Sequence, residues 1–226
     1  MSSLSRLDPP LRESYQACAR IAKEQARNFY YSFMALPAEK HAAMCAIYAW
    51  MRHSDDISDE GAEAESTGDR AAVLQAWRVA LDRAMQGDYG DSPVLAAFHD
   101  TVQRYGIPVK YFHQVIDGAE MDLSPRVYET FEDTRNYCYH VASVVGLVCI
   151  HVFEFSDPSA PELAIDNGIA FQLTNILRDL REDSSFGRVY LPREDLERFG
   201  YSEDDLRASR VNDSFCEMMR FEVERT

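Results

Sequence analysis

The sequence lacks the signatures that identify several common kinds of site. Its five cysteines form no CxxC pair, and its six histidines show no HExxH or other zinc-ligand spacing, so no zinc site is expected. The cysteines are interpreted as small apolar residues in a reducing compartment. No Gly-rich dinucleotide fingerprint is present either. That absence leaves open whether NADPH binds in another way.

Basic residues are also scarce. Lysine and arginine number 23 against 38 aspartates and glutamates, which gives a formal net charge of -15. Because a protein that binds nucleic acid normally carries a basic face, no nucleic-acid partner is expected. An anionic substrate would need local arginine, lysine or metal to overcome the field of the whole protein.

Targeting segments are missing as well. The N-terminal stretch MSSLSRLDPP has no apolar core of the kind found in signal peptides. The longest apolar run, residues 141–155, contains His151 and Glu154 and is shorter than the ~20 residues that a membrane-spanning helix requires. We therefore expect a cytoplasmic protein, with at most peripheral contact with a membrane.

Helical periodicity is what the sequence has in abundance. Apolar residues recur at three- and four-residue steps in seven segments, which are separated by turn residues. These segments are residues 11–27, 38–59, 70–86, 92–105, 109–121, 134–153 and 161–181. Strand patterns are nearly absent, and the segment FGRVYLP is too short to show whether it forms a strand. The length of 226 residues fits one all-α domain over residues 1–226.

Aspartates cluster at the predicted ends of two helices. In RHSDDISDE, Asp55 and Asp59 are four residues apart, so a helix places them on one face. In NILRDLRED, Asn175, Asp179 and Asp183 follow the same one-turn spacing. Negative charge at a helix C-terminus opposes the helix dipole. The same mildly unfavourable placement of negative charge therefore occurs at two helix ends.

The second cluster lies on a helix that is apolar around much of its circumference, GIAFQLTNILRDL. Gln172 begins a polar stripe on it that continues through Asn175 and Asp179. Such a stripe faces an internal cavity, a polar partner or bound water. Each cluster alone also fits an interpretation without function. It could be a solvated acidic face, or a buried network in which every polar group is hydrogen-bonded.

Taken together, the two clusters favour a metal site. Facing carboxylates from two helices would be relieved by divalent cations, and oxygen-only ligands favour Mg²⁺ over zinc. Mg²⁺ is usually held by a few carboxylates together with substrate phosphates. The pattern therefore predicts a diphosphate bound between two helices, with metal neutralising the leaving group.

At these residues the sequence resembles the squalene/phytoene synthase family. The first aspartate-rich motif of the family is matched by AIYAWMRHSDDISDE and the second by GIAFQLTNILRDLREDSSFGRVYLPRE. NYCYHVASVVGLV is similar to its tyrosine-containing helix, and NFYYSFMALP to a helix upstream. The resemblance covers about residues 15–200, and the run beginning EMDLSPRVYETF is most similar to bacterial presqualene diphosphate and squalene synthases.

The resemblance implies an isoprenoid synthase fold, in which a helical bundle surrounds a central cavity. It implies two or three Mg²⁺ ions held by Asp55, Asp59, Asn175, Asp179 and Asp183. The substrate-binding residues that it implies are Arg27, Phe29, Phe33, Arg52, Gln172, Arg188 and Tyr190. The implied catalytic residues are Tyr48, Arg52 and Tyr137, with Tyr137 near the reacting carbons. Val141, Val144, Val145 and Leu147 are expected to line a tunnel for the prenyl tails.

The implied reaction is a head-to-head condensation. One farnesyl diphosphate ionises with metal assistance, the alkene of a second attacks, and proton loss gives presqualene diphosphate. A second ionisation would lead to squalene, with NADPH if that product forms. Phytoene synthases acting on geranylgeranyl diphosphate share nearly all the motifs. A class I terpene cyclase, a head-to-tail elongase and, more remotely, a non-catalytic scaffold also stay open as functions for this chain.

Two departures from the family pattern affect these expectations. Ser143 stands where many members have glycine, which predicts an altered backbone approach in that helix. The ending FCEMMRFEVERT resembles an unfinished amphipathic helix, so further C-terminal helices of the family are expected to be missing. The predicted partner is a prenyl diphosphate, and no obligate protein partner is inferred.

Overall fold

The computed structural model describes residues 7–25, 27–58, 67–124 and 126–226, and in these ranges it contains helices and no strand. The predicted all-α fold is therefore confirmed. The helices in chain order are α1 (Pro9–Gln25), α2 (Arg27–Phe33), α3 (Ala38–Ser58), α4 (Thr67–Ala84), α5 (Leu95–Tyr105), α6 (Val109–Met121), α7 (Phe131–Cys138), the π-helix η2 (Tyr139–Ser143), α8 (Val144–Phe153), α9 (Ala160–Ser185), α10 (Arg193–Arg198), α11 (Glu203–Arg207) and α12 (Asp213–Arg225).

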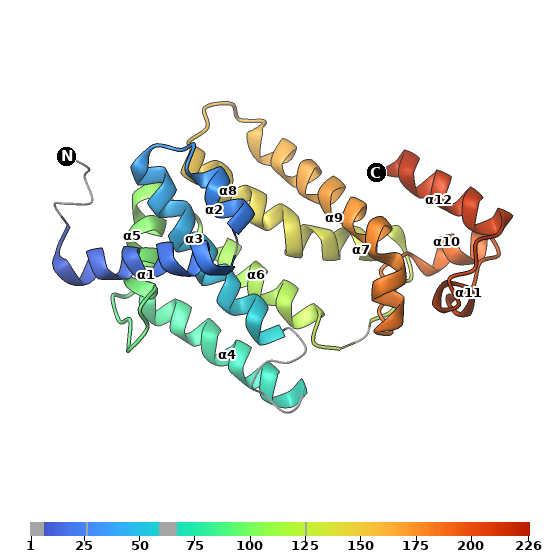
Figure 1. Cartoon of the computed structure of the whole chain (residues 1–226), viewed down its shortest axis with the longest axis horizontal. Helices are drawn as coiled ribbons and strands as arrows, with labels where there is room; N and C mark the ends of the chain where they lie inside the picture. The colour runs from blue at the N-terminus through green and yellow to red at the C-terminus, as the bar shows by residue number, and fades with distance from the viewer. Residues whose placement is uncertain (1–6, 26, 59–66, 125) are drawn as a thin grey trace.

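Helix α3 is the centre of the larger apolar core. It packs against α1, α4, α5, α6 and α8, and Figure 1 shows these helices gathered on one side of the molecule, with α10–α12 on the other and α9 between them. Trp50 of α3 is fully buried, and its ring stacks on Trp77 at 5.6 Å and on Phe98 at 5.0 Å. This aromatic contact fixes α3 against α4 and α5, and so fixes the orientation of its polar C-terminal half.

Helix α7, η2 and α8 follow one another without a break from Phe131 to Phe153. Thr130 starts the run with a capping box, because its side chain accepts from the amide of Asp133 and Asp133 accepts in turn from the amide of Thr130. The π-helix in the middle changes the direction in which the following side chains point, and π-turns of this kind are frequent at functional sites.

The π-helix approaches α9 closely. A Cβ added to Gly168 of α9 would lie 2.4 Å from the Cα of Ser143, so only glycine fits there. The Ser143 hydroxyl, which is fully buried, donates to the carbonyl of Ile165 at 2.7 Å. Position 143 is therefore a point of close backbone approach, as the departure from glycine suggested, and its hydroxyl is satisfied across the helix pair.

The run from Phe131 to Phe153 is long and apolar enough, by length and composition, to cross a membrane. It is longer than the apolar run predicted from the sequence because the helix begins ten residues earlier. Core helices of soluble proteins pass the same test, so the finding is weak evidence for a membrane span. Here α8 packs against α3, α6 and α9, and it buries Val148 and Val152 completely.

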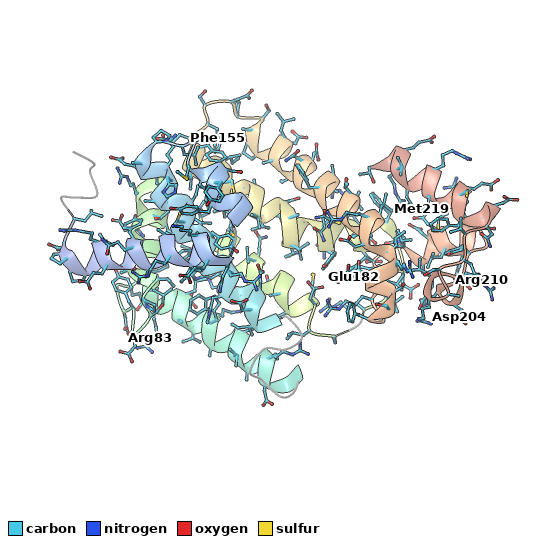
Figure 2. All side chains as sticks on the ribbon, viewed as in Figure 1. Arg83, Phe155, Glu182, Asp204, Arg210 and Met219 are labelled. Atoms are coloured by element: carbon cyan, nitrogen blue, oxygen red, sulfur yellow. The ribbon has the colours of Figure 1, made fainter. Side chains whose placement is uncertain are left out.

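The C-terminal helices form a second apolar cluster on α9. Met218 of α12 is fully buried, and Met219, labelled in Figure 2, joins the cluster that contains Ile176 and Leu180 of α9. The Arg225 guanidinium donates to Asp195 of α10 at 2.8 Å and lies 3.9 Å from the centre of the Phe131 ring. These contacts attach α12 to both α10 and α7.

The long predicted helices are all present, with ends that differ by a few residues. The structure adds α10 and α11, which the periodicity did not predict. FGRVYLP, which the sequence pattern leaves undecided, forms the connection between α9 and α10 and contains no strand. The predicted absence of C-terminal helices stays a prediction.

Candidate functional site

A cavity of about 310 Å³ lies between α2, α3, α6, η2 and α8. Most of its wall is apolar, and one end carries polar side chains. Its lining residues are Phe33, Met44, Ile47, Tyr48, Met51, Arg52, Asp55, Val115, Ala119, Asp122, His140, Val141, Val145 and Cys149. An apolar chamber with a few convergent polar groups is the usual form of a small-molecule site.

Helix α3 supplies the first polar group of residues. Tyr48, Arg52 and Asp55 are spaced by four and three residues, so they share one helical face, and all three line the cavity. Arg52 forms an ion pair with Asp56 one turn further on. Burial raises the pKa of the Tyr48 hydroxyl, while the nearby Arg52 opposes that shift. Tyr48 therefore stays a neutral donor near physiological pH.

Asp122, which follows α6, is the residue that sequence reasoning missed. Its carboxylate accepts hydrogen bonds from the Tyr137 hydroxyl at 3.1 Å and 3.2 Å and from the Tyr190 hydroxyl at 3.1 Å. It lines the central cavity and also an adjoining crevice that contains Arg188 and Tyr190. The only sequence signal was an aspartate at a predicted helix end, and nothing in the spacing linked it to the two tyrosines.

The tyrosines around Asp122 form a ring cluster. Tyr137 stacks on Tyr190 with centroids 4.8 Å apart, and Tyr128 packs against both at 5.5 Å and 5.8 Å. Burial raises the pKa of Tyr137, and it raises the pKa of Tyr190 to about 12. Both hydroxyls are therefore protonated at neutral pH and can donate to the Asp122 carboxylate.

The second aspartate motif lies along α9. Burial, and after it the repulsion from Asp179, raises the pKa of Asp183 to about 6, whereas Arg188 acts in the opposite direction. The charge of Asp122 also contributes to that rise, so Asp183 and Asp122 lie within electrostatic range of each other. The Asp179 carboxylate accepts hydrogen bonds from the neighbouring Arg178 at 2.8 Å and 2.6 Å.

Arg188 returns to this region through a tight turn after α9. Gly187 has a φ of +75°, a left-handed conformation that favours glycine, and the Arg188 amide donates to the Asp183 carbonyl at 2.9 Å. The turn keeps the Arg188 guanidinium near the aspartates of α9, where it offsets part of their charge.

The predicted residues therefore fall into groups. Phe33, Tyr48, Arg52 and Asp55 lie at the cavity, Tyr137 and Tyr190 contact Asp122, and Arg188 lines a crevice with it. Asp183 affects Asp122 through its charge. Tyr137 is 4% exposed and is connected to the cavity through Asp122. Asn175 donates to Gln172 at 3.4 Å on α9. Within the described part of the chain, neither of these two residues lines the central cavity.

The tunnel prediction is half right. Val141 and Val145 line the cavity. Val144 and Leu147, which were expected to do the same, are buried in the protein core at 0% and 2% exposure, because the lining face follows the four-residue steps Val141, Val145 and Cys149. Asp59 lies outside the described residues, and the side chains of Arg27 and Phe29 do so too although their backbone belongs to α2.

The donor chemistry of the two motifs fits Mg²⁺. Among the described residues, no three His, Cys, Asp or Glu side chains come close enough together to hold an ion by themselves. Mg²⁺ characteristically takes one or two carboxylates and completes its shell with water and substrate phosphates. The raised pKa of Asp183 shows a carboxylate that a nearby cation would stabilise. Figure 1 shows the C-terminal ends of α3 and α9 directed toward the same edge of the molecule.

A helical bundle with this cavity has the isoprenoid synthase fold. The squalene/phytoene synthase family model matches residues 22–226, and the chain belongs to that family. It is 39% identical to the 15-cis-phytoene synthase of Synechococcus elongatus over 98% of this chain and 74% of that protein. It is 38% identical to the phytoene synthase of Arthrospira platensis over 94% of this chain and 72% of that protein.

Solved structures agree with this assignment. The squalene synthase HpnC from Alicyclobacillus acidocaldarius superposes with a TM-score of 0.89 at 30% identity, over 99% of this chain and 83% of that one. A dehydrosqualene synthase superposes with a TM-score of 0.82 at 28% identity, over 95% of this chain and 74% of that one. The chain spans 51% of the chloroplastic phytoene synthase 1 of Arabidopsis thaliana.

Proposed function

We propose that this chain is a prenyltransferase that joins two prenyl diphosphates head to head in a Mg²⁺-dependent reaction. The observation that carries the proposal is the polar end of the central cavity. Asp55 of the first motif and Asp122 line the same cavity, and Asp122 lies within electrostatic range of Asp183 of the second motif. This arrangement supports a diphosphate site between the two motifs, at the polar end of an apolar chamber.

Each part of this site has a role in the proposed reaction. Asp55, Asp59, Asn175, Asp179 and Asp183 would hold Mg²⁺, which neutralises the departing diphosphate. Arg52 and Arg188 would add fixed positive charge where negative charge develops. The apolar wall would bury the prenyl tails at roughly 0.8 kcal/mol for each methylene group. The aromatic faces can stabilise an allylic cation without quenching it.

Two chain lengths are candidates for the substrate. The similarity to a squalene synthase structure over nearly the whole chain supports farnesyl diphosphate, with presqualene diphosphate or squalene as product. The 39% and 38% identity to two phytoene synthases supports geranylgeranyl diphosphate, with phytoene as product. Both candidates require the same head-to-head chemistry and the same site.

Product analysis tests the proposal. The protein is incubated with farnesyl or geranylgeranyl diphosphate, with Mg²⁺ or with EDTA, and with or without NADPH. We expect a C30 or C40 head-to-head product, or its cyclopropyl diphosphate precursor, only in the presence of Mg²⁺. Exclusively cyclic C15 products would indicate a terpene cyclase, and longer linear diphosphates an elongase. No metal-dependent turnover of either substrate would favour a scaffold.

A further inference from the structure

A second cavity, of about 400 Å³, lies on the other side of α3 from the central one. We call it the side pocket. It is open to solvent and is bordered by α1, α3, α4 and the connection between α4 and α5. Arg52 is the one residue that lines both the side pocket and the central cavity, among the residues that the structure describes. The family site uses the central cavity, so the side pocket is not accounted for by the proposed function.

The wall of the side pocket is largely apolar. Ile21 of α1, Ala49 of α3 and Val94 form its sides, and the Trp77 indole forms part of its floor. The indole nitrogen of Trp77 is already satisfied, because it donates to the Ser54 hydroxyl at 3.0 Å. The pocket therefore presents apolar surface for the body of a ligand, and it is in the size range that accommodates one.

The rim of the side pocket carries a net negative charge. Arg52 and Asp56 form an ion pair and cancel each other. His53 packs against Trp77, with ring centroids 4.3 Å apart. Asp91 makes no hydrogen bond or ion pair with any other residue in the described ranges. Among the arginine and aspartate side chains of the rim, one positive and two negative groups leave a formal charge of -1.

We propose that the side pocket binds an amphipathic cation, meaning an apolar or aromatic body that carries a primary ammonium group. The body would lie on Ile21, Ala49 and Val94, and the ammonium would pair with the Asp91 carboxylate. A carboxylate or phosphate head would meet the unbalanced charge of Asp91 and the field of a protein with a formal charge of -15, both of which repel it.

The two tryptophans of the sequence give a readout of probe binding, and the variants described next decide which cavity holds the probe. Trp77 lines the side pocket and Trp50 stacks on it, whereas no tryptophan lines the central cavity. The probe is dansylcadaverine, a naphthalene sulfonamide with an alkylammonium tail, and its anionic match is dansyl-6-aminohexanoate. Energy transfer from tryptophan to dansyl is followed during titration of the protein. We expect saturable transfer with the cation and much weaker transfer with the anion.

Variants locate the probe. Asp91→Asn should weaken the cation about two- to fivefold, the size expected for one exposed charge pair. Ser92→Phe should fill the pocket and abolish saturable transfer. Two matched controls should leave binding unchanged: Asp88→Asn removes a carboxylate of the same connection that pairs with Arg83, and Val145→Phe fills the central cavity instead.

Three results would overturn the proposal. They are equal affinity for the cationic and anionic probes, unchanged binding in both Asp91→Asn and Ser92→Phe, and loss of binding in Val145→Phe. Circular dichroism of each variant shows whether it has folded. If Ser92→Phe fails to fold, the affinity of the cationic probe for Asp91→Asn, compared with that for Asp88→Asn, still tests the proposal. These measurements need no substrate, so their failure is separate from failure of the proposed function.

Discussion

At the scale of single residues, the Asp122 carboxylate organises the polar end of the cavity. Two tyrosine hydroxyls donate to it, and the stacked rings of Tyr137 and Tyr190 hold those hydroxyls in place. Hydrogen bonds to a charged acceptor contribute about 1.5–3 kcal/mol each, and losing one leaves a partly buried charge under-solvated. The tyrosines should therefore affect both folding and the electrostatics of the site.

Tyr137→Phe tests this arrangement. We expect it to lower the free energy of unfolding by about 1.5–3 kcal/mol, because Asp122 loses a donor. Turnover should fall as well, because the carboxylate is no longer fixed. Tyr128→Phe is the matched control: its ring belongs to the same cluster, but its hydroxyl makes no hydrogen bond to Asp122 among the described residues. Urea unfolding distinguishes the two variants, and equal losses would contradict the role given to Asp122.

Asp55→Asn tests the first motif. Removing a ligand leaves the charge of the leaving group uncompensated, and the loss of one electrostatic partner typically lowers kcat by about 100- to 1000-fold. We expect a loss of that order in diphosphate release, with folding retained, because Asp55 is exposed on the cavity side of α3. A kcat near that of the unsubstituted protein would show that Asp55 is not a metal ligand.

The sequence predicted the residues of this site unevenly. Tyr48, Arg52 and Asp55 could be placed on one face because they follow one another within a single helix. Asp122 could not be found, since its partners Tyr137 and Tyr190 are 15 and 68 residues away in the chain. The helical period relates positions within an element, and it carries no information about which elements meet.

At the scale of elements, the contact between η2 and α9 sets the shape of the cavity wall. Gly168→Ala would place a Cβ 2.4 Å from the Ser143 backbone, so one of the two helices must move. Overpacking of this kind costs about 1–3 kcal/mol, and we expect the upper end of that range because backbone cannot rotate away. Gly146→Ala, whose Cβ would meet the Ala164 carbonyl at 3.2 Å, should cost less. Thermal unfolding shows which of the two variants is less stable. A smaller loss of stability in Gly168→Ala than in Gly146→Ala would contradict this packing.

The attachment of α12 should depend on pH. Burial raises the pKa of Glu222, and Arg225 only partly opposes that shift. The folded protein therefore holds a proton at pH values where the unfolded chain has lost it. The stability contributed by this group is present below the ordinary glutamate pKa and falls as the pH rises above it. Relative to Glu222→Gln, the unsubstituted protein should lose stability as the pH rises above about 4, the ordinary range of a glutamate pKa.

Urea unfolding at a series of pH values from about 4 upward measures the effect. Glu224→Gln, on the exposed side of the same helix, is the control and should track the unsubstituted protein at every pH. A pH dependence that is identical in Glu222→Gln and in the unsubstituted protein would show that another group is responsible.

Most elements could be predicted because their apolar periodicity is strong. Helix α6 was predicted with its observed bounds, and α3 and α5 to within a few residues. The π-helix could not be predicted, because the apolar period does not distinguish it from an α-helix; it lies where Ser143 approaches Gly168 of a different helix. The short helices α10 and α11 have six and five residues, too few for a periodic signal.

At the scale of the whole molecule, α3 separates two cavities. Its polar face turns Tyr48 and Asp55 toward the central cavity, and its opposite side turns His53 and Asp56 toward the side pocket. The bundle on both sides of α3 is held by the stacked aromatic core around Trp50. The polar groups of the central cavity on α3, Tyr48, Arg52 and Asp55, therefore stand on a helix that is packed on several sides.

The central claim is that aspartates of α3 and α9 together bind a diphosphate through Mg²⁺. Calorimetric titration with inorganic pyrophosphate, with Mg²⁺ and with EDTA, tests it most directly. Asp55→Asn and Asp183→Asn should each lose the metal-dependent binding. Glu182→Gln, next to Asp183 but exposed and labelled in Figure 2, should keep it. Metal-independent binding, or loss at only one of the two helices, would contradict the account.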